Sequence, residues 1–439
     1  MAHDRYDHRA VLHIATPLIL SNITVPLLGM VDTAVVGHLD SPHYIGAVAV
    51  GAIIFSFIYT GLNFLRMGTT GITAQTLGTR DNDELRTVLG QVLSVAFGMA
   101  AILLLLQVPI GVLALWLINP SADVAAQTEI YYSIRIWSAP AALANFALVG
   151  WFIGLHNARA PLFMMILVNI VNIGLDILFV VYLGMRADGV ALASVLAEYS
   201  GFAVGLFLVA RELRLRPGHW IRSRLTDKHR FKRLFAVNAN LLIRTMSLMF
   251  AFGFLTAMSA RQGDIILAAN AILLNMQYFM ASALDGFANA AEALVGRAIG
   301  AKHRDSIKRA IRLSMFWSVV IALMFVVAYA IGGAWIIKLL TDLEPIRAAA
   351  ILFLPWIILS PIISTWSFLY DGVYVGATLA REMRNTMVFS TFLIFLPAYW
   401  LLQPLGNHGL WLSFLLFMAA RGLTMWWLLP RKLPTLQLN

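Results

Sequence analysis

The chain has 439 residues, of which 60% are hydrophobic and only 12% are charged. About a quarter of the residues in soluble domains are charged, so this composition excludes a soluble protein and indicates an integral membrane protein. The net charge of +10 would suit a nucleic-acid partner, but Lys and Arg also accumulate in cytoplasmic loops of membrane proteins, and we expect no nucleic acid. The absence of cysteine excludes disulfides and thiolate metal sites.

Twelve apolar stretches follow one another along the chain, each long enough for a transmembrane helix. About 20 helical residues cross the roughly 30 Å of hydrocarbon. The polar residues up to Arg9 lead directly into the first stretch, so we expect no cleaved signal peptide. The predicted spans lie near residues 12–37, 45–72, 87–113, 126–155, 161–184, 187–212, 231–259, 264–295, 307–334, 346–379, 385–403 and 407–429.

The two halves of the chain resemble each other at a constant spacing. The segment 78–83 matches 300–305, an offset of 222 residues (300 − 78). We therefore predict an all-α membrane protein of two pseudo-symmetric six-helix bundles, with an N-terminal lobe over 1–212, a basic cytoplasmic linker over 213–230 and a C-terminal lobe over 231–439. Such duplicated bundles are typical of transporters that alternate access. The same offset relates Gly150, Gly154, Ala158 and Arg159 to Gly372, Gly376, Ala380 and Arg381.

The distribution of basic residues predicts the orientation in the membrane. If the N-terminus is cytoplasmic, the segments outside hold only Arg186, Arg261, Lys338 and Arg347 of the 32 Lys and Arg residues. Because cytoplasmic loops carry the excess of Lys and Arg, we expect a multi-pass protein of the inner (cytoplasmic) membrane with both termini in the cytoplasm.

Two carboxylates in the first half are candidates for ion coupling. Asp32 and Asp176 fall at similar depth in spans 1 and 5, and Asn172 shares a helical face with Asp176. An intramembrane charge costs roughly 3 kcal/mol, and two nearby carboxylates cannot both ionise cheaply, so the pair can take up and release a proton. The same oxygens would suit Na⁺. The alternative for each residue is a hydrogen bond that only fixes helix packing.

Two further features of the spans bear on mechanism. Pro17 and Pro26 each remove a backbone hydrogen bond from helix 1, which predicts either a bend that depends on the charge of Asp32 or a static kink. In the second half, Arg244, Asp285 and Asp371 fall at comparable depth, and a buried Arg requires a counter-ion. These residues form either an ion-pair network or part of a substrate site.

Nothing in the chain indicates an enzyme. There is no Gly-x-x-x-x-Gly-Lys-Ser/Thr loop to bind ATP, so we expect no cofactor and an ion gradient as the energy source. Spans 2, 7, 8 and 10 are rich in Met and aromatic residues, which can form an adaptable apolar chamber that attracts organic cations.

Four motifs carry a resemblance to a known family. They are Pro26-Leu-Leu-Gly-Met-Val-Asp-Thr-Ala-Val-Val-Gly-His38, Arg66-Met-Gly-Thr-Thr-Gly-Ile-Thr-Ala-Gln75, Asn169-Ile-Val-Asn-Ile-Gly-Leu-Asp176 and Asp371-Gly-Val-Tyr-Val-Gly-Ala-Thr378. Together they resemble the multidrug and toxic compound extrusion (MATE) family, in its DinF-like branch. The resemblance implies two six-helix lobes in a V around a cleft, and export of amphiphilic, often cationic compounds in exchange for H⁺ or Na⁺.

The resemblance also implies roles for individual residues. The N-lobe polar cluster of DinF-like relatives falls on Asp32, Asn172, Asp176 and Ser194, and their helix-1 bending proline on Pro17. Other branches carry an acid in helix 7, where this chain has Leu248 with Arg244 nearby, so a C-lobe Na⁺ site is disfavoured although Asp371 keeps its helix-10 position.

The resulting hypothesis is a monomeric multidrug/proton antiporter that contributes to antibiotic resistance. Its partners would be small amphiphilic or cationic substrates, H⁺ and membrane lipids. The alternatives are Na⁺ coupling at the same cluster, and a flippase or exporter for lipid-linked precursors or polysaccharides. The last alternative predicts a strongly cationic cavity, whereas the intramembrane charges here are mixed.

Overall fold

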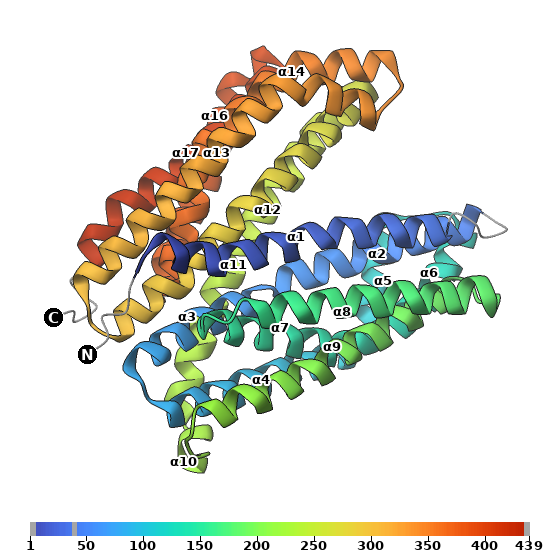
Figure 1. Cartoon of the computed structure of the whole chain (residues 1–439). Coiled ribbons are helices and arrows are strands. Elements are labelled where there is room, and N and C mark those ends of the chain that lie inside the picture. The colour runs from blue at the N-terminus through green and yellow to red at the C-terminus, as the bar shows by residue number, and fades with distance from the viewer. Residues whose placement is uncertain (1–5, 37–41, 434–439) are drawn as a thin grey trace. The chain divides into compact units, whose positions relative to one another are not determined.

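The computed structural model describes residues 6–36 and 42–433, and the side chains of residues 23–42 lie outside that description. The described chain is helical and contains no strand, which confirms the predicted all-α membrane fold (Figure 1). The elements are α1 (His8–Val36), α2 (Pro42–Leu62), α3 (Phe64–Thr79), α4 (Asn82–Leu105), α5 (Gln107–Ile118), α6 (Ala122–Arg135), η1 (Ile136–Ser138), α7 (Ala139–Gly154), α8 (Arg159–Asp176), η2 (Ile177–Tyr182), α9 (Ala187–Leu215), α10 (Arg222–Leu225), α11 (Lys228–Arg261), α12 (Asp264–Gly300), α13 (Arg304–Leu340), α14 (Glu344–Gly376), α15 (Ala380–Phe389), η3 (Ser390–Phe395), α16 (Leu396–Leu402), η4 (Gln403–Leu405) and α17 (Asn407–Lys432).

Each predicted span corresponds to one helix or to a run of consecutive helical segments. Eleven segments between His43 and Lys432 are long and apolar enough to cross a membrane, and the 29-residue α1 precedes them. The predicted spans are shorter than the observed helices, because several helices are longer than the hydrocarbon core is thick. The 37 residues of α13, for example, measure about 55 Å. Two spans contain a π-helical stretch, η2 and η3, which hydropathy does not reveal.

The contacts divide the chain into two compact units. The first-half unit is Leu20–Lys232, and the second-half unit is Arg233–Asn439 together with Met1–Ile19. One boundary therefore falls inside α1, between Ile19 and Leu20, and the other falls between Lys232 and Arg233, two residues beyond the predicted linker 213–230. Within the second-half unit, Trp317 Nε1 donates to His8 Nδ1 at 3.1 Å, and Gly286 lies against the Ile19 side chain.

Close helix packing repeats in the two units at the offset found in the sequence. A Cβ added to Gly150 would lie 2.4 Å from the Arg66 carbonyl oxygen, and one added to Gly372 would lie 2.1 Å from that of Ala288. Arg66 and Ala288 are again 222 residues apart (288 − 66). Small residues let membrane helices approach this closely, so the α3–α7 pair of one unit has the same design as the α12–α14 pair of the other. The contact recurs one turn later, at Gly154 with Thr70 and at Gly376 with Glu292.

We expect Gly372→Ala to destabilise the protein by at least about 1–3 kcal/mol, because the added methyl group meets backbone that cannot move aside as a side chain can. Thermal unfolding of the purified protein in detergent measures the effect. The matched control is Gly332→Ala in α13, where nothing lies within 4 Å of the added carbon. Equal melting temperatures for the two variants would contradict the packing argument.

The basic segment after α9 is anchored to the start of α4 within the first-half unit. Arg224 of α10 pairs with Asp81 at 3.2 Å and with Glu84 at 3.4 Å. The backbone N–H of Glu84, and next the Arg224 guanidinium, hold the pKa of the Asp81 carboxyl below its ordinary value. Arg86 donates to two carbonyl oxygens at the end of α9 and just beyond it. Part of the positive charge of this segment therefore serves to hold it in place.

Candidate functional site

A buried polar cluster lies between α8 and α9 in the first-half unit. Asp176, the last residue of α8, is 0% exposed, and Asn172, one turn earlier on the same face, is 3% exposed. Asn172 Nδ2 donates to Ser194 Oγ of α9 at 3.4 Å. The π-helical turn η2 begins directly after Asp176, and such turns are frequent at functional sites. The structure thus joins Asn172 to Ser194, with Asp176 on the same face of α8.

The cluster continues along α9 toward α7. Glu198 lies one turn beyond Ser194, and its carboxylate Oε2 accepts a hydrogen bond from Asn145 Nδ2 at 2.9 Å. The same amide group donates to the Glu198 carbonyl oxygen at 3.0 Å. Three apolar helices, α7, α8 and α9, therefore each contribute polar side chains to the interior of this unit.

Three further polar residues, Tyr59, Ser138 and Arg135, lie near this cluster, and the sequence did not indicate that they belong with it. The Tyr59 hydroxyl lies 2.7 Å from Ser138 Oγ, and the charges of Arg135 and Glu198 both act on Tyr59. The Arg135 guanidinium lies 5.7 Å from the centre of the Phe55 ring. The available signal was Arg135 itself, because an arginine inside predicted span 126–155 marks a functional position.

The predicted site residues of helix 1 are only partly covered by the structure. Asp32 and Pro26 belong to α1, but their side chains lie outside the described residues, so the expected approach of Asp32 to Asp176 stays a prediction. Pro17 is partly buried, and α1 continues as a helix through it.

The second-half unit holds a buried ion-pair network. Asp371 of α14 accepts from Arg244 of α11 and, at 2.6 Å, from Nη2 of Arg421 of α17, with both bonds on the carboxylate atom Oδ2. All three side chains are less than 10% exposed. Asp285 is exposed on α12, and its charge also acts on Arg421. Two guanidinium groups on one carboxylate repel a further cation, so this geometry disfavours a Na⁺ site at Asp371.

The repeat has no polar cluster at the matching place in the second half. Adding 222 to 32, 172 and 176 gives Phe254, Ile394 and Ala398. Phe254 packs against aromatic rings, with ring centres 5.5 Å from Phe395 and 5.0 Å from Tyr399. The two halves therefore share their helix packing but not their polar side chains. At these matching positions the acids occur only in the first half.

Comparisons with known proteins agree with the arrangement of the chain. The MatE family profile matches residues 17–178 and 240–400, once in each half. The chain is 44% identical to DNA damage-inducible protein F of Escherichia coli K12 over 97% of its own length and 92% of that protein. It is 29% identical to the probable multidrug resistance protein NorM of Caulobacter vibrioides, over 94% and 90%. A crystal structure of a MATE protein in the bent conformation superposes with a TM-score of 0.88 at 18% identity, covering 98% of this chain and 96% of the other.

Proposed function

The chain belongs to the MatE family of multidrug and toxin extrusion transporters, which are not enzymes, and we propose that it is an antiporter exporting amphiphilic, often cationic organic compounds in exchange for protons. The observation that carries the proposal is the wholly buried carboxylate Asp176 beside the polar Asn172 and Ser194. A carboxylate in such a place is costly to charge and cheap to protonate, so its charge can follow the access of protons to the site.

In the proposed cycle, Asp176 and Asp32 take up protons from outside, and the loss of negative charge releases a cationic substrate outward. Release of the protons toward the cytoplasm restores the charge that attracts the next substrate. The Asn172 amide and the Ser194 hydroxyl can hydrogen-bond either form of a carboxyl group, which lets the cluster keep its packing through the cycle.

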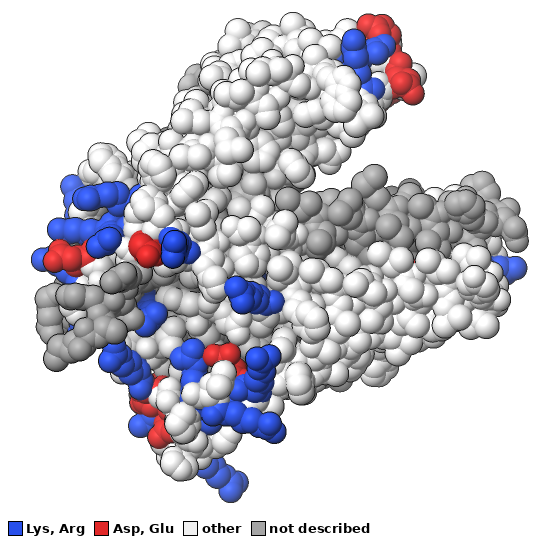
Figure 2. Space-filling model, viewed as in Figure 1, with Lys and Arg blue, Asp and Glu red and all other residues white. Residues whose placement is uncertain are grey.

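We also infer that the protein lies in the inner membrane as a monomer with both termini in the cytoplasm. In support, most of the Lys and Arg on the face shown in Figure 2 gather at one end of each unit, while the sides of the helices on that face carry almost no charge. The rule that cytoplasmic loops hold the basic residues then places the basic end of each unit inside.

The test is transport of one fluorescent organic cation in proteoliposomes, with the pH and Na⁺ gradients varied independently. We expect a pH gradient without Na⁺ to drive accumulation of the cation, and a Na⁺ gradient at equal pH to have no effect. Transport driven by Na⁺ alone would replace proton coupling by Na⁺ coupling at the same carboxylate and amide oxygens. Failure of both gradients would reject ion-coupled antiport.

A further inference from the structure

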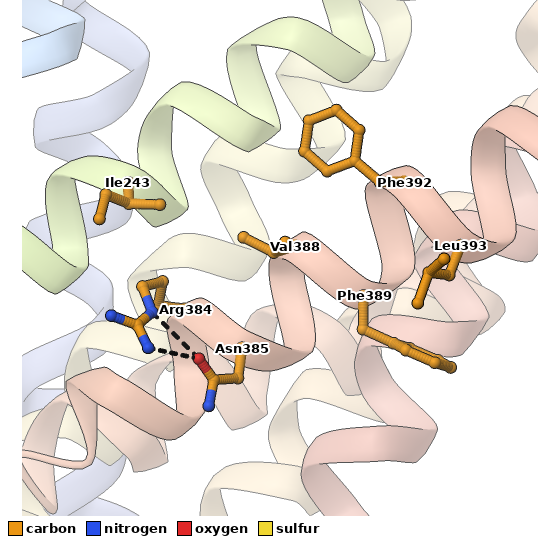
Figure 3. Close-up of a pocket in the computed structure, with 7 residues that line it drawn as sticks. All are labelled: Ile243, Arg384, Asn385, Val388, Phe389, Phe392 and Leu393. Atoms are coloured by element: carbon orange, nitrogen blue, oxygen red, sulfur yellow. Dashed lines mark hydrogen bonds between the residues drawn. The ribbon is translucent and has the colours of Figure 1, made fainter.

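An open groove of about 670 Å³ runs along the surface of the second-half unit, between α11 and the α15–η3 segment. This volume is in the range of ligand sites. Figure 3 shows that Arg384 and Asn385 mark one end of the groove, while Phe389, Phe392 and Leu393 lie toward the other. The groove therefore has a polar end and an apolar length.

The guanidinium group of Arg384 is held in place by neutral partners. Its Nε and Nη2 donate to Asn385 Oδ1 at 3.0 and 2.7 Å, and its Nη1 donates to Asn240 Oδ1 at 2.8 Å. Among residues 6–36 and 42–433, no carboxylate forms an ion pair with it. The one acid of α15, Glu382, pairs with Lys432 at 3.0 Å. Arg384 thus presents a full positive charge at the mouth of the groove.

Arg384 directly precedes the predicted span 385–403, and its charge is therefore expected at the depth of lipid headgroups. Arg384 lies four residues after Ala380, the start of α15, or about 6 Å along the helix, and exposed Arg381 lies between them. The apolar residues that follow lead into the hydrocarbon. An organic cation would be repelled at this mouth, whereas a phosphate would be bound by both charge and hydrogen bonds.

We propose that this groove binds one anionic phospholipid, with the headgroup phosphate on Arg384 and an acyl chain along Phe389, Phe392 and Leu393. The proposal needs only that the chain spans a membrane. The cytoplasmic leaflet follows if the orientation proposed above is right, and proton coupling plays no part in it.

A local probe tests the site, because the chain has no cysteine of its own. The Leu393→Cys variant carries a fluorescent label and is reconstituted into two kinds of vesicle. In one kind phosphatidylglycerol has brominated acyl chains that quench the label, and in the other phosphatidylcholine has them. Leu423→Cys on α17 is the matched position, since the two leucines are 63% and 62% exposed. At residue 393 we expect brominated phosphatidylglycerol to quench about five times more strongly than brominated phosphatidylcholine, because one basic residue at a membrane surface favours an anionic lipid by about that factor. At residue 423 we expect the two lipids to quench equally.

Arg384→Gln should abolish the preference at residue 393, while Arg381→Gln, on the same helix but outside the groove, should keep it. If Arg384→Gln does not fold, Asn385→Asp, which sets a carboxylate beside the guanidinium, should lower the preference in its place. Equal quenching by both lipids in the otherwise wild-type protein, or a preference that survives these changes, would overturn the proposal. If the label fluorescence changes instead with protein concentration, the groove is assigned to a second copy of the chain. If it changes on addition of a cationic substrate, the groove is assigned to the cargo.

Discussion

Replacing Asp176 by Asn is expected to reduce proton-driven efflux to the background of empty vesicles while the protein still folds. Asn has the size of Asp but cannot ionise, so the cluster keeps its packing and loses the charge that the proposed cycle switches. Transport of a fluorescent cation under a pH gradient measures the loss. Proton release on substrate addition, followed with a pH-sensitive dye, should disappear with it.

The matched control is Asp188→Asn, which removes a half-buried acid from the first turn of α9 and should leave efflux unchanged. Asp32→Asn should reproduce the Asp176 defect, because both acids serve one cluster in the hypothesis. If Asp176→Asn transports like the wild type at equal expression, the acid only fixes helix packing and the coupling site lies elsewhere.

The sequence predicted the fold well because the membrane restricts the possible structures. A chain that crosses hydrocarbon must satisfy its backbone within helices of about 20 residues, so hydropathy alone locates them. The duplicated glycines were equally informative, since the same spacing that relates Gly150 to Gly372 relates the backbone atoms against which they pack. The extra turns of long helices such as α13 lie outside the hydrocarbon, where hydropathy carries no information.

The candidate site was only partly predictable, because helical periodicity acts within one helix. The shared face of Asn172 and Asp176 follows from their spacing of four residues. The contact of Asn145 with Glu198 depends on which faces of α7 and α9 meet, and no local pattern specifies that. For the same reason the sequence places Arg421 within predicted span 407–429 but does not assign it a partner.

The ion-pair network of the second-half unit predicts a large loss of stability. Asp371→Asn leaves the guanidinium groups of Arg244 and Arg421 buried against a neutral amide. Breaking a buried pair by removing one partner costs about 3–5 kcal/mol, because the remaining charge is uncompensated. We expect low yields of this variant and a strongly lowered melting temperature in detergent, with part of the loss arising from each arginine. Wild-type stability of Asp371→Asn would contradict the network.

A rescued variant separates the structural role of the network from a role in substrate binding, the two alternatives that the sequence left open. Replacing Asp371 by Leu together with Arg244 and Arg421 by Met removes all three charges at similar volume. Such exchanges of buried ion groups for apolar residues are often neutral or stabilising by about 1–4 kcal/mol. Because the proposed coupling acids lie in the first-half unit, the rescued protein should again transport under a pH gradient. A stable but inactive triple variant would show instead that these charges contact the cargo.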